Sequence, residues 1–464
     1  MQEVSAHSAV ESRSRFSVGL RLVLAVALAS TLTAGVVLLF SYMADRAYDL
    51  FLQWPALGAA LPLASLATYG LYRALHVDFS TSTADVIEQV KSGKHVSTRL
   101  APAIFAGTCL SVLGSASVGK EAAALQIGAS VSSWIAGGME SGEASVRTRQ
   151  LRRTISLAGM ASAFSILLGA PVAAALFVCE ISGAILGTAG IKLKHRHSCA
   201  TDASPAPDAS DLARAVEFVL ILASAFWARI IAVSCGAHGL SGAVPTLGMS
   251  LGTFEHVLAL VAVEAVVGCV FCIALAKGRA AFGKLPVSKP VVLLVGGVAW
   301  FSVVVGFGFT DITGTGMAQV SQALAGQVDT PLFAGKLLAT VLLLSCGFKG
   351  GEIMPMLCIG STLGCFAGGL LGMDPVFAAA LGTAAFMTAC TNCPLAALAL
   401  ALECFGVGNV AFYVPAIALA FVFTLPVSLY GNEWSPRRIA SAAKRHVHMP
   451  FAPAALPETP SIRE

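Results

Sequence analysis

Charged residues are scarce in this chain. Asp, Glu, Lys and Arg make up 12% of its 464 residues, whereas a soluble domain carries roughly 25%. Hydrophobic residues account for 56%, and the mean hydropathy is +0.80. Ordinary globular packing cannot hide so much apolar surface, so the bilayer is expected to be the solvent. The formal net charge is only +4 and its basic residues cluster in connecting loops, which disfavours nucleic-acid binding.

Disulfides and bound metals also have little support. Most of the 12 cysteines lie scattered in apolar segments, where free cysteine packs as a small hydrophobe. Cys390-Thr-Asn-Cys393 has the spacing of metal and redox centres, but the internal repeat described below puts Leu167 and Ala170 at the equivalent positions, which favours packing. The string His195-Arg-His-Ser-Cys199 is interpreted as a solvated loop. We predict no disulfide framework, no metal and no cofactor.

Apolar segments fill most of the chain, and a membrane-spanning helix needs about 20 such residues. The predicted spans are Leu20–Met43, Ala56–Leu71, Val216–Val233, Val257–Ala276, Val291–Phe309, Leu332–Cys346 and Val410–Tyr430. Other segments are shorter and interrupted by Gly or Pro, namely Ala101–Gly114, Ala122–Gly137, Ile155–Ala170, Val172–Leu186, Ile353–Leu371 and Ala378–Ala389. Broken segments favour a transporter, because irregular backbone at membrane depth has to line a cavity. The sequence therefore predicts an all-α polytopic membrane protein.

Two glutamates stand at breaks in this apolar sequence. Gly119-Lys-Glu121 and Gly350-Gly-Glu352 each precede an apolar, helix-like run. A carboxylate at membrane depth is costly unless something compensates for it. The free N–H groups and positive dipole end of a helix N-terminus attract anions and can supply that compensation. Two such positions in one membrane chain suggest an anion pathway.

The chain also repeats itself. A proline, an Ala/Leu-rich segment and a glutamate occur twice at the same spacing, as Pro171 to Glu180 and as Pro394 to Glu403, and a glycine precedes each proline at an equal distance. Transporters commonly place their site between such repeats. The predicted divisions are a cytoplasmic N-terminal segment (1–19), a first membrane repeat (20–190), a polar linker (191–213), a second membrane repeat (214–432) and a cytoplasmic tail (433–464).

At these residues the chain resembles a known family. Gly119-Lys-Glu-Ala-Ala123 resembles the Gly-Lys/Arg-Glu-Gly-Pro signature of the CLC chloride channels and anion/proton antiporters. Gly350-Gly-Glu-Ile-Met-Pro355 resembles that family's Gly-x-Phe-x-Pro signature, and Leu429-Tyr430 resembles its C-terminal pore tyrosine. The resemblance implies a CLC-like fold of two inverted, pseudo-symmetric halves built from short, tilted and broken helices. It also implies a homodimer with one pore per subunit.

The resemblance further implies roles for individual residues. Glu121 would be the gate, because its ionised carboxylate imitates the transported anion and its protonated form loses that attraction and swings away. Tyr430 would close the inner side with its hydroxyl, although its position alone favours an interfacial aromatic residue. The anion would be held by backbone N–H groups of Ala122, Ala123, Ile353 and Met354.

Two parts of the family pattern are missing. The first family signature, Gly-Ser-Gly-x-Pro, is replaced by Ser80-Thr-Ser-Thr-Ala84, so Thr81 is the candidate for the pore serine. Gly314-Thr-Gly316 is interpreted as its counterpart in the second half. The family's internal proton-transfer glutamate aligns with Ile181, which puts chloride/proton exchange of the usual kind in doubt.

Glu352 is a further departure, since most of the family has an apolar residue there. The form Gly-Gly-Glu-x-x-Pro resembles the fluoride/proton antiporter branch, in which a second acid near the pore could pass the proton. That branch's Asn-containing first signature is not found near Thr81. The competing interpretation of Glu352 is a helix N-terminal charge paired with Lys349.

The predicted function is transport of small inorganic anions, chloride or fluoride, with protons and the lipid bilayer as the other partners. A fluoride/proton antiporter and, outside the family, a secondary transporter of organic anions remain as alternatives. An enzyme is not predicted. Gly114–Lys120 fits the start of a phosphate-binding loop, but Glu121 stands where Ser or Thr would hold Mg²⁺.

Both ends are predicted to be cytoplasmic by the positive-inside rule. The first apolar stretch follows no convincing cleavage site, so it is interpreted as an anchor rather than a signal peptide. We predict a multi-pass protein of a bacterial inner membrane. The basic residues that indicate this orientation are Arg13, Arg15, Arg21, Arg437, Arg438, Lys444 and Arg445.

Overall fold

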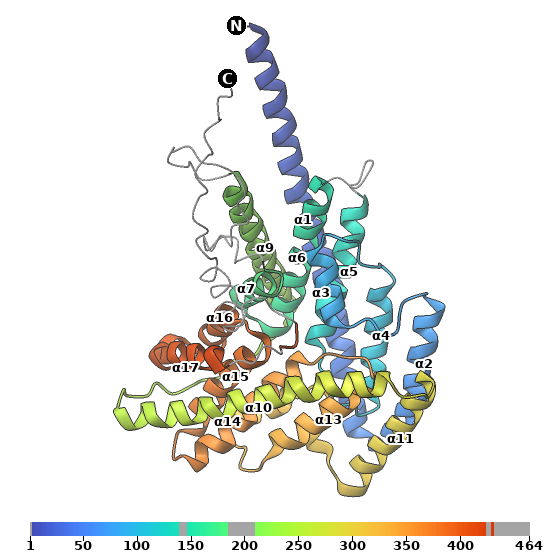
Figure 1. Cartoon of the computed structure of the whole chain (residues 1–464), viewed down its shortest axis with the longest axis vertical. Helices are drawn as coiled ribbons and strands as arrows, with labels where there is room; N and C mark the ends of the chain where they lie inside the picture. The colour runs from blue at the N-terminus through green and yellow to red at the C-terminus, as the bar shows by residue number, and fades with distance from the viewer. Residues whose placement is uncertain (1, 139–145, 184–208, 424–427, 431–464) are drawn as a thin grey trace, which may run out of the picture.

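The computed structural model describes residues 2–138, 146–183, 209–423 and 428–430 (Figure 1). The regular elements within these ranges are all helices, which confirms the all-α membrane fold. Six helices in this part of the chain are long and apolar enough to cross a membrane: α1 (Gln2–Gln53), α6 (Val146–Leu168), α9 (Ala209–Ser234), α10 (Leu251–Gly283), α11 (Lys289–Phe307) and α14 (Ile353–Leu370).

The remaining helices are shorter. Two predicted spans are too short or divided: residues 56–71 are split between a 3-10 helix and α2, and α13 has 15 residues. Both are predicted to cross the bilayer on their own, and helices of this length cannot. The predicted span Val410–Tyr430 includes residues 424–427, which lie outside the described residues. The shorter helices are α2 (Leu61–Ala74), α3 (Thr83–Lys91), α4 (Leu100–Leu113), α5 (Glu121–Gly138), α7 (Pro171–Ile181), α12 (Met317–Ala323), α13 (Leu332–Cys346), α15 (Pro375–Thr391), α16 (Pro394–Phe405) and α17 (Val410–Phe423), with 3-10 turns at Pro55–Ala60, Thr310–Ile312 and Val407–Asn409.

Local sequence explains where many of these helices begin and end. Proline occupies one of the first two positions of α7, α15 and α16, where its missing N–H would have no helical partner. Asp374 caps α15 by accepting a 2.9 Å hydrogen bond from the amide of Phe377. Gly347 ends α13 in the left-handed conformation with φ of 102°, which glycine adopts at little cost.

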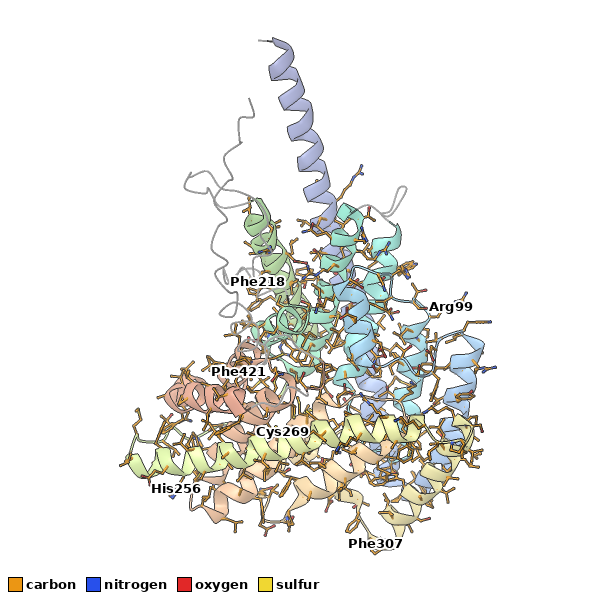
Figure 2. The ribbon with its side chains drawn as sticks, in the orientation of Figure 1. Arg99, Phe218, His256, Cys269, Phe307 and Phe421 are labelled. Atoms are coloured by element: carbon orange, nitrogen blue, oxygen red, sulfur yellow. The ribbon has the colours of Figure 1, made fainter. Side chains whose placement is uncertain are left out.

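Long helices cross one another at steep angles. α10 has 33 residues and is therefore about 50 Å long, more than the roughly 30 Å hydrocarbon core, so it must be tilted. In Figure 1, α10 runs from side to side, whereas α1 runs from the top of the view downwards. Figure 2 marks His256 near the start of α10 and Cys269 in its middle. The first turns of α1 extend beyond the rest of the bundle (Figure 1).

The same close helix crossing occurs in each half. A Cβ atom on Gly128 of α5 would lie 2.5 Å from the carbonyl oxygen of Gly159 on α6. A Cβ atom on Gly360 of α14 would lie 2.8 Å from the carbonyl oxygen of Gly382 on α15. Such distances leave room for hydrogen only, so the repeated glycines are explained by backbone-to-backbone contact between consecutive helices.

The repeated glutamates cap each other's helices. Glu180, at the end of α7, accepts hydrogen bonds from the amides of Leu395 and Ala396 at the start of α16 (3.1 and 2.8 Å). Glu403 of α16 reciprocally accepts bonds from the amides of Val172 and Ala173 at the start of α7 (3.0 and 2.8 Å). The two helices therefore pack antiparallel, each supplying the other's N-terminal acceptor.

Two predicted divisions fall largely outside the described residues. The tail (433–464) and most of the polar linker (191–213), with its His195-to-Cys199 string, are in those parts of the chain. Helix α1 runs without a break from the predicted N-terminal segment into the first span. The described cysteines, including Cys390 and Cys393, form no disulfide with one another.

Candidate functional site

A short backbone pairing joins the two glutamate segments at the centre of the protein. The amide of Gly119 donates to the carbonyl of Gly351, and the amide of Gly351 donates to the carbonyl of Gly119, both at 2.7 Å. Added side chains would not fit: a Cβ on Gly119 would lie 2.7 Å from Pro355, and one on Gly351 would lie 2.5 Å from Ala122. The glycines before each glutamate thus bring the starts of α5 and α14 together.

Glu121 is fully buried at the start of α5. Its Oε2 atom accepts a 3.0 Å hydrogen bond from the amide of Lys120, so the carboxylate bends back over the N-terminus of its own helix. Its Oε1 atom has no hydrogen-bond partner among the described residues. The amides of Ala122 and Ala123 follow in the first helical turn, where backbone N–H groups lack intrahelical partners. A carboxylate oxygen occupies the position that suits a small anion.

Glu352 lies in a different environment. It holds the N-cap position of α14 and is buried, and its Oε2 atom lies 3.4 Å from Nη2 of Arg279 on α10. Lys349, the partner considered from sequence, points elsewhere. Its ammonium donates to the carbonyl of Phe79 and lies over the rings of Tyr72 and Phe79. The competing interpretation of Glu352 is therefore right about the helix N-terminus but wrong about the partner, because the cation beside Glu352 comes from α10.

Glu352 and Arg279 line a cavity of about 360 Å³, which we call the Glu352 cavity. Lys289 and Lys349 add two more positive charges to its lining, and Thr81 and Ser345 add hydroxyl groups. Cationic and hydroxyl groups around a cavity favour anions, which accept hydrogen bonds from both. Gly350, the residue before the paired Gly351, also lines this cavity.

A second cavity, of about 550 Å³, reaches the other glutamate segment at Lys120, and we call it the Lys120 cavity. The Lys120 ammonium lies 2.6 Å from the Asp45 carboxylate and 2.9 Å from the Ser41 hydroxyl, both on α1. Glu121 lines neither cavity. The buried carboxylate and the glycine pairing therefore separate two polar cavities.

Thr81 lies in the segment that precedes α3, partly buried in the lining of the Glu352 cavity. The neighbouring Ser82 caps α3 in a capping box with Asp85, whose carboxylate accepts bonds from the Ser82 amide and hydroxyl at 2.9 and 2.7 Å. The N-terminus of α3 is thus partly satisfied by its own acid, which the sequence analysis did not anticipate. Gly316 is the N-cap of α12, so Gly314-Thr-Gly316 also precedes a short helix.

Tyr430 is buried, and its ring packs edge-on against Phe177 at a centroid distance of 6.1 Å. Its hydroxyl makes no hydrogen bond of ordinary geometry to another described residue, and Glu352 is among its electrostatic neighbours. A buried hydroxyl that lacks a partner is available to one. The structure thus brings Thr81 and Tyr430 to the region of Glu352, and Ala122 and Ala123 to that of Glu121.

Two buried lysines hold the segments that precede the short helices. Lys336 of α13 is fully buried and donates to the carbonyls of Ile312, Thr313 and Gly314 at 3.3, 3.2 and 2.7 Å. Lys349 binds the carbonyl of Phe79 before α3 in a similar way. Sequence reasoning passed over Lys336, although a lysine inside an apolar run is a costly feature that marks functional regions.

The fold has clear relatives. A protein described as a "Chloride/fluoride channel protein" from Pseudomonas syringae pv. tomato is 26% identical over 397 residues, which cover 84% of this chain and 80% of the relative. The crystal structure of a CLC-type fluoride/proton antiporter matches with a TM-score of 0.74 and 22% identity, over 89% of this chain and 97% of that one. A slow cyanobacterial Cl⁻/H⁺ antiporter matches with a TM-score of 0.70 and 18% identity, over 92% and 98%. The profile of the family described as "Voltage gated chloride channel" matches residues 64–425, and the chain therefore belongs to the CLC family.

Proposed function

We propose that this protein transports small inorganic anions, chloride or fluoride, through a pathway gated by Glu121. The single observation that carries the proposal is the placement of the Glu121 carboxylate. It is buried between two polar cavities and bends over the N-terminus of α5. An ionised carboxylate there competes directly with an anion for the same helix end.

The gate would work by exchange of one negative group for another. Protonation removes the charge of Glu121 and with it the attraction to the helix N-terminus, so the side chain leaves and an anion takes its place. The amides of Ala122 and Ala123 on one side, and of Ile353 and Met354 on the other, would then hold the anion. The Thr81 hydroxyl would donate from the Glu352 cavity, and the Tyr430 hydroxyl would donate from its buried position near Glu352.

Coupling to protons is the finer part of the proposal. The position of the family's internal proton-transfer acid is Ile181, the last residue of α7, so another acid has to carry protons if they move. Glu352 is the acid that lines a cavity beside the pathway. The presence of Glu352 favours fluoride/proton antiport over the other forms of the proposed function. The names of the relatives include both chloride and fluoride.

Basic residues indicate the side that faces the cytoplasm. The end of α10, the loop that follows it and the start of α11 contain Lys277, Arg279, Lys284 and Lys289 and no acid, which favours a cytoplasmic position for this region by the positive-inside rule. The Glu352 cavity would then be the inner mouth and the Lys120 cavity the outer one. Both termini would be cytoplasmic, and a homodimer with one pore per subunit follows from the family.

Anion efflux from liposomes that contain the purified full-length protein tests the proposal. We expect chloride or fluoride to leave faster than from empty vesicles, and pH recorded alongside distinguishes a channel from an antiporter. If neither ion leaves faster, the assignment is wrong. Competition by small organic carboxylates would instead indicate a transporter of organic anions.

A further inference from the structure

Arg279 joins the Glu352 cavity to the buried carboxylate. Its side chain is 35% exposed, whereas that of Glu352 is 3% exposed, and the two are 3.4 Å apart. The guanidinium therefore lines the cavity and contacts the carboxylate at the same time. An anion that enters the cavity can reach the outer N–H groups of Arg279, since a guanidinium has five donors.

The other charged or titratable groups around Glu352 are placed differently. Lys349 is held by the Phe79 carbonyl and two aromatic rings. Lys289, on α11, lines the same cavity without an ion pair to Glu352. Tyr430 has Glu352 among its electrostatic neighbours, and Glu121 lies across the glycine pairing and accepts a hydrogen bond from the Lys120 amide. Within the described ranges, Arg279 is the one cation at ion-pair distance from Glu352.

We propose that Arg279 is a positioning residue that exchanges partners. It pairs with Glu352 while the cavity holds no anion, and it pairs with the anion when one arrives, which frees Glu352 to take a proton from hydronium in the cavity. The inference rests on the proposed function and adds the group that links the two ions to each other.

Charge balance explains why the exchange favours proton uptake. The closed Arg279–Glu352 pair is neutral, and an arriving anion adds one negative charge that shares the same guanidinium. Transfer of one proton from hydronium to the Glu352 carboxylate gives a carboxylic acid and water, and restores neutrality. Because such linkage is reciprocal, the anion strengthens proton binding by the same factor as the proton strengthens anion binding. An anion arriving from the far side thus promotes proton uptake from this side, as exchange requires.

The test measures how chloride changes the pH dependence of proton flux. The full-length protein is reconstituted in liposomes, proton flux is driven by a potassium diffusion potential, and the pH of half-maximal flux is determined at low and at high chloride. The same series is repeated with fluoride. For the unaltered protein we expect this pH to be higher at high anion than at low anion, because the anion draws the Arg279 guanidinium away from the Glu352 carboxylate.

Variants of Arg279 test whether this residue causes the anion-dependent shift. Arg279→Gln should give the same half-maximal pH at both anion concentrations, and Arg279→Met is a second neutral variant in case the first inserts poorly. Arg279→Lys should retain part of the anion-dependent shift because it keeps the charge. Lys289→Gln should keep the shift but need more anion, since it lines the cavity without touching Glu352. Lys284→Gln, exposed and outside the cavity lining, is the matched control.

The possible failures can be told apart. An anion-dependent shift that survives in both neutral variants overturns the role of Arg279, as does its complete loss in Arg279→Lys. Anion efflux without any proton movement in the unaltered protein overturns this inference and leaves anion transport standing. Absence of anion efflux refutes the proposed function itself.

Discussion

The Glu403 carboxylate accepts a 2.8 Å hydrogen bond from the amide of Ala173, 230 residues earlier in the chain. Glu180 makes the equivalent bond to the amide of Ala396. Each glutamate stands near the end of one helix and satisfies the free N–H groups at the start of the other. The two halves of the chain are therefore held together by reciprocal caps between α7 and α16.

Removing these caps should destabilise the protein unequally. Glu180→Ala leaves two amides unsatisfied in a buried position and should cost about 2 kcal/mol, whereas Glu403→Ala, at an exposed position, should cost about 1 kcal/mol. Heating in detergent followed by size-exclusion chromatography ranks the variants. Glu255→Ala, an exposed acid of α10, is the control. Equal stability of Glu180→Ala and this control would contradict the capping interpretation.

The repeat was visible in the sequence, but the contacts that it encodes were not. The equal spacing from proline to glutamate matches the length of α7 and of α16, so each glutamate lies at the far end of its helix. Spacing along one chain cannot reveal that the two helices lie side by side and antiparallel. That relation depends on long-range packing, which decides which N-terminus each acid reaches.

The repeated glycines allow a sharper test of the helix crossings. Gly360→Ala would place a methyl group 2.8 Å from the Gly382 carbonyl and 2.5 Å from the Phe386 side chain, and such overpacking typically costs about 1–3 kcal/mol. Gly369→Ala on the same helix meets nothing within 4 Å and should be neutral. The comparison uses the same heating assay in detergent. Similar midpoint temperatures of unfolding for both variants would show that α14 and α15 can move apart without loss of stability.

The candidate site was only partly predictable. Glu121 and Glu352 stand out because acids are rare in apolar sequence, and glycines beside them indicated a break in the helices. The partner of Glu352 was not predictable, because Arg279 lies 73 residues earlier on a tilted helix. Lys349, the partner in the competing interpretation, is close to Glu352 in sequence, but its ammonium donates to the carbonyl of Phe79 instead.

The ion pair between Lys120 and Asp45 should affect the anion concentration at which transport is half-saturated. In the Lys120 cavity, Asp45 neutralises Lys120 at 2.6 Å while remaining half exposed. Asp45→Asn should lower the half-saturating anion concentration about threefold, and Lys120→Met should raise it about threefold, since an ion pair with one exposed partner is worth up to about 1 kcal/mol. Initial efflux rates at varied anion concentration measure both. Asp49→Asn, one turn further along α1 and paired only with Arg46 among the described residues, is the control. A rise of the half-saturating concentration in Asp45→Asn together with a fall in Lys120→Met would refute the cavity's role as the outer mouth.

Neutralising Glu121 should separate anion movement from proton movement. Glu121→Gln keeps the shape of the side chain but cannot ionise, so it neither competes with an anion for the α5 N-terminus nor carries a proton. Downhill anion efflux should persist, should lose the part of its pH dependence that Glu121 causes, and should no longer drive protons, because a side chain that does not titrate cannot pass a proton along the pathway. Parallel recordings of anion and pH in liposomes measure this, with Glu255→Gln as the control. Proton movement that continues at the rate of the unaltered protein would remove Glu121 from the mechanism.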